Sequence, residues 1–436
     1  MRFVSTVALA ALFFCMQTYS QTPADLAEQW DKHHISKIFP SNMRHRTLLP
    51  MLEELKKTGV KVEQVGVSYS GRSIHQIEWG KGPLKVFMWS QMHGDEPTAT
   101  PALIDMFTFL QKNGDKDWVK RISEKMTIRA VPMLNPDGAE LFIRRNVQGI
   151  DINRDARDLK TPEAQLLKRL RDEWSPEIGF NLHNQNSLTA AGQTKKQAAI
   201  SFLVVYGDAA KTDTDGQLRN KRIVGVMNAA LYQFIPGHIG RYGDEWTPSA
   251  FGDSFSEWGT STILIETGGL HGKDEMYLVK MNFVAFLAAL NSIADGSERA
   301  MSTTNYDMIP NNSGGRIVDI IIRNATVIDP SKPDQPLLGD IALVRERRRA
   351  EFNTPTTIRR LGDAGILSGL DEYDASGFNV VGRFMPIKQG SQGELLFYKK
   401  SRTVDWKSPE LEKAFPPDAV FSLGNWVVGA GLVPKR

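Results

Sequence analysis

Two kinds of hydrophobic pattern alternate along the middle of this chain. Short runs of mostly apolar residues predict buried strands, and they read LKVFMWS, MTIRAVPML, EIGFNLH, AAISFLVVY and STILIET. Between these runs, apolar residues recur three and four positions apart, which predicts helices with one buried face. The helical segments are residues 101–111, PEAQLLKRLRDEW, QLRNKRIVGVMNAALYQF and DEMYLVKMNFVAFLAALNSIAD. This alternation predicts an α/β fold, in which a mostly parallel but mixed, twisted sheet is flanked by helices.

The pattern changes on both sides of this region, which we place at residues 61–296. Residues 21–60 have the apolar spacing of helices and predict an N-terminal helical segment. Residues 297–315 are polar and rich in turn-forming residues, which is typical of a linker. Beyond them, residues 316–436 contain strand-like runs such as IVDIIIRNATVID and GELLFYKK, so we expect a small β-rich accessory domain.

The first 20 residues have the build of a secretory signal peptide. A short basic start precedes the apolar run FVSTVALAALFFCM, and we place the cleavage after Ser20. The only cysteine, Cys15, lies in this run without the small residue expected before a lipid-modified cysteine, so we expect a soluble product. An exported chain without disulfides is common in bacteria. We therefore predict a bacterial periplasmic or extracellular protein with no stable membrane insertion after cleavage.

Composition and charge are ordinary and indicate no special class of protein or partner. Hydrophobic residues make up 41% of the 436 residues and charged residues 24%, as in ordinary globular proteins. The formal net charge of +3 is small, and no polybasic block is present, so nothing indicates a nucleic-acid partner.

Four residues that can bind metals or move protons fall at the ends of predicted strands. His93 and Glu96 follow the strand LKVFMWS, His183 ends EIGFNLH, and Glu266 comes near the end of STILIET. Active sites of open α/β sheets form at the carboxyl ends of strands. An HxxE pair alone is a weak signal, and a lone histidine is more often a hydrogen-bonded core residue. Glu266 is less ordinary, because an unpaired charge after an apolar run is costly.

A longer block makes the interpretation specific. The stretch LNPDGAELFIRRNVQGIDINRDARD contains NPDG, a pair of arginines and GxDxNR. Together with HxxE, the distant His183 and the late Glu266, it resembles the zinc carboxypeptidases of the pancreatic carboxypeptidase type, with all of these elements in the family order. The resemblance spans about residues 62–294 and implies the carboxypeptidase-like α/β fold.

The resemblance also implies roles for individual residues. His93, Glu96 and His183 would hold Zn²⁺, one ion per chain, with a water in the open position. Glu266 would be the general base, and Arg144 would face the developing oxyanion.

Substrate-binding residues are implied in the same way. Asn153 and Arg154 would grip a free C-terminal carboxylate, for which a guanidinium is well suited. Tyr242 is the candidate for the family's mobile tyrosine, and Arg145 is a further candidate near the site. Preference for the terminal residue would come from TPSAFGDSFSEW, where Phe251 favours apolar ends and Asp253 favours basic ends. The sequence does not choose between them.

We therefore expect a secreted zinc-dependent carboxypeptidase that acts on peptides with a free C-terminal carboxylate. One alternative is a related zinc amidase acting on peptidoglycan stem peptides or N-acyl amino acids. Another is a non-catalytic carboxypeptidase-like binding module, whose expected sign is a lost ligand or base. No such loss is visible in the sequence.

Overall fold

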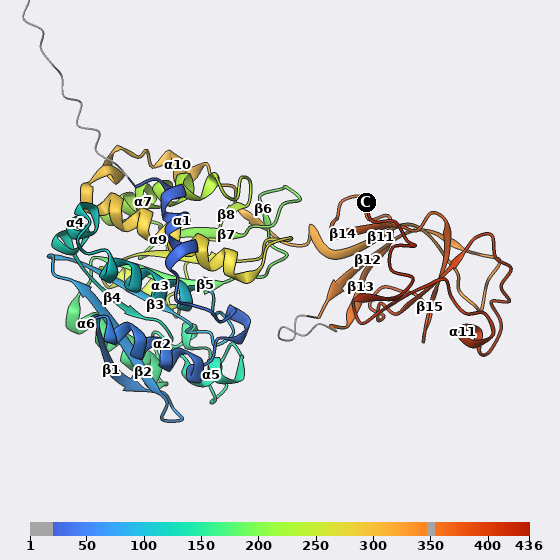
Figure 1. Cartoon of the computed structure of the whole chain (residues 1–436), viewed down its shortest axis with the longest axis horizontal. Helices are drawn as coiled ribbons and strands as arrows, with labels where there is room; N and C mark the ends of the chain where they lie inside the picture. Colours follow the sequence, from blue (N-terminus) through green and yellow to red (C-terminus); the bar gives the residue numbers. More distant parts are fainter. Residues whose placement is uncertain (1–20, 347–353) are drawn as a thin grey trace, which may run out of the picture.

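The computed structural model describes residues 21–346 and 354–436. The predicted signal peptide, with Cys15, lies outside the described residues. The chain forms a large α/β body followed by a smaller β-rich body, joined near strand β6 (Figure 1). Both halves of the fold prediction are confirmed. The predicted domain limits stay a prediction.

The α/β body is built on an eight-stranded sheet with the order β1-β2-β4-β3-β5-β9-β7-β8. Its centre is parallel, since β4, β3, β5 and β9 all run the same way. The pairs β1·β2, β2·β4 and β7·β9 are antiparallel, so the sheet is mixed. The strands are β1 (Lys61–Val67), β2 (Ser73–Gly80), β3 (Leu84–Ser90), β4 (Met126–Val131), β5 (Ile178–Asn184), β7 (Ile200–Val205), β8 (Ile239–Arg241) and β9 (Ser261–Thr267).

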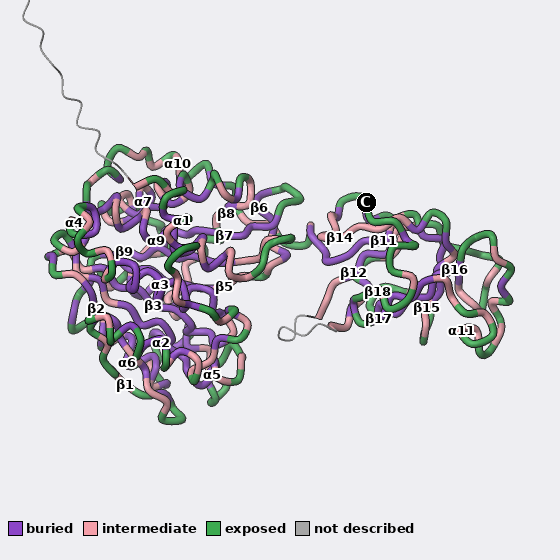
Figure 2. Tube along the Cα trace, in the orientation of Figure 1, coloured by how far each residue is buried: buried purple, intermediate pink, exposed green. Residues whose placement is uncertain are grey.

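Both faces of the central strands are covered by helices, which explains their continuous apolar sequences. In β3, alternate side chains point to opposite faces. Val86 and Met88 join the larger core, and Phe87 and Trp89 join a second core on the other face. Figure 2 shows these central strands as buried. The site residues lie at the carboxyl ends of these strands.

Both long and short helices surround the sheet. They are α1 (Pro23–His33), α2 (His45–Lys57), α3 (Ala99–Lys112), α4 (Asp117–Lys125), α5 (Pro136–Leu141), α6 (Pro162–Trp174), α7 (Asp215–Tyr232), α8 (Phe251–Glu257), α9 (Glu275–Asp295) and α10 (Thr304–Asp307), with 3₁₀ turns η1 (Pro40–Asn42), η2 (Ile152–Arg154) and η3 (Ser297–Ala300). By length and composition α9 could span a membrane, but most of its residues are buried in the larger core.

Two short helices beside the site were not expected. Helix α5 begins at Pro136, and the Asn135 side chain accepts a hydrogen bond from the Gly138 N–H as its N-cap. Helix α8 begins at Phe251. Elements this short carry too few turns for a helical period to be visible in the sequence.

The C-terminal body is a second eight-stranded sheet with the order β13-β12-β11-β15-β16-β17-β18, in which β14 also pairs with β11. Its apolar core gathers residues such as Ile322, Leu343 and Phe397. The elements are β11 (Ile317–Val327), β12 (Leu337–Arg345), β13 (Thr356–Gly362), β14 (Ser368–Asp374), β15 (Phe378–Gly382), β16 (Leu395–Lys399), α11 (Leu411–Ala414), β17 (Ala419–Ser422) and β18 (Asn425–Val428). We call this body the C-terminal module, residues 316–436.

The segment between the two bodies is ordered by contacts with the α/β body. Strand β10 (Asn312–Ser313) pairs antiparallel with β6 (Ala190–Ala191). Tyr306 is buried, and its hydroxyl accepts a hydrogen bond from the Val204 N–H at 3.1 Å. The chain that leaves the α/β body is therefore held against it before the C-terminal module begins.

Helix α9 supplies a direct test of the larger core. Leu287 is completely buried there, so Leu287→Ala should lower the free energy of unfolding by about 2–5 kcal/mol through lost burial and a residual cavity. Leu338→Ala, at a side chain that is 72% exposed, is the matched control and should change it by less than about 0.5 kcal/mol. Urea unfolding followed by tryptophan fluorescence measures both. Equal effects of the two changes would contradict the assigned core.

Candidate active site

Three side chains from two neighbouring parallel strands converge at the carboxyl edge of the sheet. His93 and Glu96 follow β3, and His183 lies in β5, which pairs with β3. Nδ1 of His93 lies 2.8 Å from one Glu96 oxygen, and Nδ1 of His183 lies 2.7 Å from the other. One ligand atom from each residue lies within 4.8 Å of the others, and all three residues are buried.

This donor set fits a zinc ion. Two imidazoles and one carboxylate are a ligand combination of catalytic zinc sites. Among the described residues, Nδ1 of His93 has no hydrogen-bond partner, because its 2.8 Å contact with Glu96 lacks hydrogen-bond geometry. A buried ring nitrogen that faces a carboxylate without bonding to it is placed as a metal ligand would be.

Asp151 fixes the orientation of His93 from the other side. Its Oδ1 lies 3.0 Å from Nε2 of His93, and its Oδ2 accepts a hydrogen bond from Nε of Arg144 at 3.0 Å. A carboxylate on the outer nitrogen of a metal-binding histidine sets the tautomer and the ring orientation. Asp151 is the acidic residue of the GxDxNR motif, and the sequence alone indicates no role for it. Its place in that motif was the available signal.

The NPDG motif packs the loop that carries His93. A Cβ on Gly94 would lie 2.0 Å from the backbone carbon of Gly138, so neither loop leaves room for a side chain there. The Asn135 side-chain amide donates to the carbonyls of Met92 and Arg144 at 3.3 and 3.4 Å. These contacts hold the His93 loop and the Arg144 loop together, so NPDG is a positioning motif.

Arg144 reaches the ligand cluster directly. Its Nη1 donates to Glu96 Oε1 at 3.1 Å, and its side chain is partly exposed on the pocket side. The guanidinium thus places a positive charge in the pocket beside the ligand cluster. Arg145, the next residue, does not line this pocket, since its Nη1 donates to the Gly149 carbonyl at 2.8 Å.

Glu266 stands in β9, one strand beyond His183, with which it is in register. Its side chain is only 6% exposed, and its Oε2 has no hydrogen-bond partner among the described residues. Burial, and then the negative charge of Glu96, raise the pKa of Glu266 well above its ordinary value. The buried carboxyl aimed into the site is the arrangement expected of a proton-transfer group.

The ligand side chains differ in their electrostatics. Burial lowers the pKa of His183. Burial also acts to lower the pKa of His93, but the charge of Glu96 and the hydrogen bond to Asp151 outweigh it and raise that pKa. Despite burial, the two imidazoles hold the pKa of Glu96 far below its usual range. Glu96 is therefore ionised and ready to bind a cation.

A pocket of about 360 Å³ opens over these residues. Asn153, Arg154 and Tyr242 line it together with the ligands, Arg144 and Glu266, as the sequence predicts. Asn153 is fixed by accepting a hydrogen bond from the Phe251 N–H at 2.9 Å. The pocket is also lined by Asn181, Asn184, Gln185, Asn186 and Thr189, which the sequence gave no reason to select.

The structure separates the two candidate specificity residues. Phe251 is completely buried, packs against Phe255 and Trp258 in the second core, and does not line the pocket. Asp253 does line it. Of the two, only the carboxyl can meet a substrate side chain.

Comparisons with known proteins agree with this site. The family model described as zinc carboxypeptidase matches residues 46–215. Carboxypeptidase 2 of Trichophyton rubrum is 30% identical over 216 residues, which are 49% of this chain and 38% of that protein. Carboxypeptidase SOL1 of Arabidopsis thaliana is 30% identical over 130 residues, which are 26% of each protein. The crystal structure of a "putative carboxypeptidase A" from Shewanella denitrificans OS-217 has a TM-score of 0.50 at 15% identity and covers 58% of this chain and 69% of that one.

Residues 46–215 of this chain match the zinc carboxypeptidase family, and the curated relatives to which the chain is similar are carboxypeptidases. The aligned segments span well under half the length of the curated relatives. Glu266 lies beyond the segment that the family model matches, so its assignment depends on the geometry described above.

Asp151 provides a test of the metal site that does not need a substrate. Asp151→Asn removes the carboxylate that orients His93, so the affinity for zinc should fall by about 10–100-fold. Chelator competition against apo-protein measures this affinity. The control is Asp158→Asn, a nearby exposed acid paired with Lys160, which should leave zinc affinity unchanged. Undiminished affinity in Asp151→Asn would remove its positioning role.

Proposed function

We propose that this chain is a zinc-dependent carboxypeptidase that hydrolyses the C-terminal peptide bond of peptides with a free terminal carboxylate. The observation that carries the proposal is that His93, Glu96 and His183 converge in one pocket beside the buried Glu266. A ligand-binding module has no use for an unpartnered buried carboxyl next to a metal site, and both ligands and base are retained. This favours catalysis over binding alone.

The proposed chemistry divides among the pocket residues. A bound zinc ion supplies an activated water at neutral pH. Glu266 accepts the proton of that water at its carboxylate and later donates it to the leaving amine. Arg144 stabilises the negative charge that develops on the scissile carbonyl oxygen. The support for these roles is that Glu266 and Arg144 both line the pocket that the metal ligands line.

Exopeptidase action follows from Asn153 and Arg154. Arg154 is exposed toward the pocket, and its Nη1 donates to the Asn153 carbonyl at 2.6 Å, which leaves other donors for a substrate carboxylate. A fixed cation beside the scissile bond favours chains that end there. Tyr242, 39% exposed at the rim, is placed to cover the bound terminus.

We also propose that the protein is exported, to the periplasm or the medium of a bacterium, and that it binds one zinc ion per chain. The support for export is the composition of residues 1–20. The support for one ion is that, in the part of the chain that the structure describes, only His93, Glu96 and His183 form a cluster able to hold a metal.

The exopeptidase proposal predicts a dependence on the free carboxylate. Zinc-loaded protein should release the last residue of a free-acid peptide and leave the matching C-terminal amide intact, as mass spectrometry of the digests will report. Glu266→Gln should keep zinc and lose about 10²–10⁴-fold in kcat, because the proton acceptor is gone. The surface variant Glu257→Gln should match the wild type. Equal cleavage of acid and amide would instead identify an amidase of broader action.

The position of Asp253 favours a basic terminal residue. Burial raises its pKa to about 6, an effect that the Thr247 N–H and Arg154 oppose. The carboxyl is therefore neutral well below pH 6 and negatively charged above it. In the charged state it can pair with the side chain of a terminal lysine or arginine.

The Asp253 assignment predicts a pH-dependent preference. The ratio of kcat/KM for an Arg-terminated over a Leu-terminated peptide should rise by about tenfold as pH increases through about 6, the equivalent of one charge-assisted hydrogen bond. Taking the ratio at each pH cancels the titration of the catalytic groups and changes in zinc loading. Asp253→Asn should give a flat ratio. A wild-type ratio that does not vary with pH would refute the assignment.

A further inference from the structure

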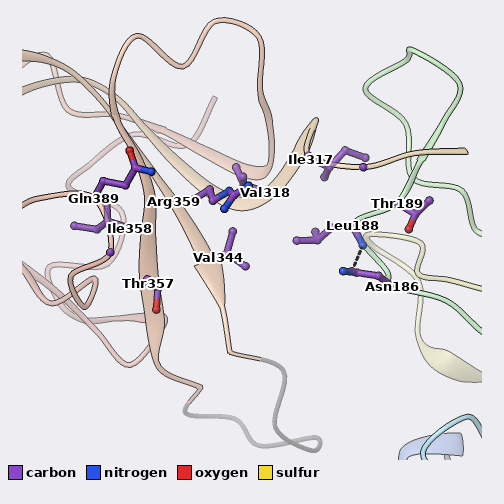
Figure 3. A pocket seen from close by; sticks show the side chains of 13 residues that line it. Asn186, Leu188, Thr189, Ile317, Val318, Val344, Thr357, Ile358, Arg359 and Gln389 are labelled. Carbon is purple, nitrogen blue, oxygen red and sulfur yellow. Dashed lines mark hydrogen bonds between the residues drawn. The ribbon is translucent and has the colours of Figure 1, made fainter. Parts of the chain in front are cut away.

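A second cavity, of about 380 Å³, lies where the α/β body meets the C-terminal module (Figure 3). Its walls come from the loop after β5, from the end of the linker, from β11, β12 and β13, and from a turn of the module. Its lining residues include Asn186, Leu188, Thr189, Gly314, Val344 and Arg359.

This interdomain cavity shares part of its wall with the active-site pocket. Asn186 and Thr189 line both. Both residues lie in the short loop after the strand that carries His183, so one loop lines the zinc site and the interdomain cavity.

The shared wall is held in place from both bodies. Strand β6, at the end of the loop, pairs with β10 of the linker. Asn312 donates to the Gln185 side chain at 2.8 Å, and Leu188 and Ala190 pack against Ile317 of β11. The interdomain cavity is therefore a built part of the fold, with its position fixed relative to the zinc ligands.

The lining is suited to a peptide side chain. In Figure 3 Leu188 points from the α/β body toward Val344 of β12, and these apolar groups face the same space. The guanidinium of Arg359, on β13, has no hydrogen-bond acceptor or carboxylate partner among the described residues. Gly314 is exposed, and a Cβ there would meet nothing within 4 Å.

When a peptide is bound with its last residue in the active-site pocket, the rest of the peptide must extend away from that residue in one direction. Its terminal carboxylate is held by Arg154, so the residues upstream of the scissile bond must leave through another wall of the pocket. We propose that these upstream residues cross Asn186 and Thr189 into the interdomain cavity, where apolar side chains contact Leu188 and Val344 and acidic ones pair with Arg359. This inference rests on the proposed function, and it makes the C-terminal module part of the substrate-binding surface.

The first test uses peptide length. For wild-type protein, kcat/KM should rise about tenfold between an N-acylated dipeptide and peptides of five or more residues, as for burial of one aliphatic side chain. Gly314→Trp, which fills the cavity at a backbone position without strain, should abolish this gain and leave dipeptide cleavage unchanged. Gly377→Trp is the matched control, since Gly377 is also exposed with open space around it. It should behave as wild type.

Each outcome separates the two proposals. If the wild type cleaves no peptide, the proposed carboxypeptidase function fails and this inference with it. Cleavage of all lengths at one kcat/KM overturns the inference alone, as does an equal loss for short and long peptides in Gly314→Trp. Binding gives an independent readout: the zinc-loaded Glu266→Gln protein should bind longer peptides more tightly in fluorescence anisotropy, and adding Gly314→Trp should remove the difference.

The second test uses charge. Wild-type protein should prefer peptides with upstream Glu over upstream Lys by about threefold, the scale of an exposed ion pair. Arg359→Glu should reverse this preference. Arg360→Glu makes the same change of net charge one residue away, at an exposed side chain that does not line the interdomain cavity, and should leave the preference unchanged. An equal shift in both variants would mean that only overall charge is sensed, and would overturn the role of Arg359.

Discussion

The site depends on one buried carboxylate. Glu96 is enclosed between two imidazoles, with Arg144 on the same oxygen as His93, and this surrounding positive potential keeps it ionised in a place where a lone carboxylate would be neutral. Without such partners the desolvation of a negative charge would be prohibitive. The loops that carry His93 and Arg144 are therefore coupled through Glu96, and a change in either one alters the electrostatics of the other.

The sheet supplies the precision that this arrangement needs. β3, β5 and β9 are adjacent and parallel, so their carboxyl ends lie side by side and bring together residues far apart in sequence. The strands are packed on both faces, which leaves their ends little freedom to shift. Asp151 and the close contact between Gly94 and Gly138 then fix the loops that emerge from these ends. The packing of the core therefore determines the positions of the site residues.

Much of this was visible in the sequence because the signals are local. The continuous apolar runs of β3, β5 and β9 and the period of α9 predict the α/β fold, and HxxE, GxDxNR and the late Glu266 predict the site. What escaped prediction depends on contacts between distant segments. Examples are the burial of Phe251, the contact of Asp151 with His93 and the pairing of β6 with β10. Each depends on a partner from another segment of the chain, so the neighbouring sequence contains no pattern that predicts it. Helices as short as α5 and α8 are below the length at which periodicity can be read.

The two-residue ladder between β6 and β10 has a consequence for how the protein can be divided. The loop that descends from His183 ends in β6, whose partner strand belongs to the segment that leads to the C-terminal module. A chain truncated before Asn312 would lack the strand that pairs with β6, and it would lack the Asn312 amide that donates a hydrogen bond to Gln185. The loop after one imidazole of the metal site is thus supported by residues that come after the last helix of the α/β body.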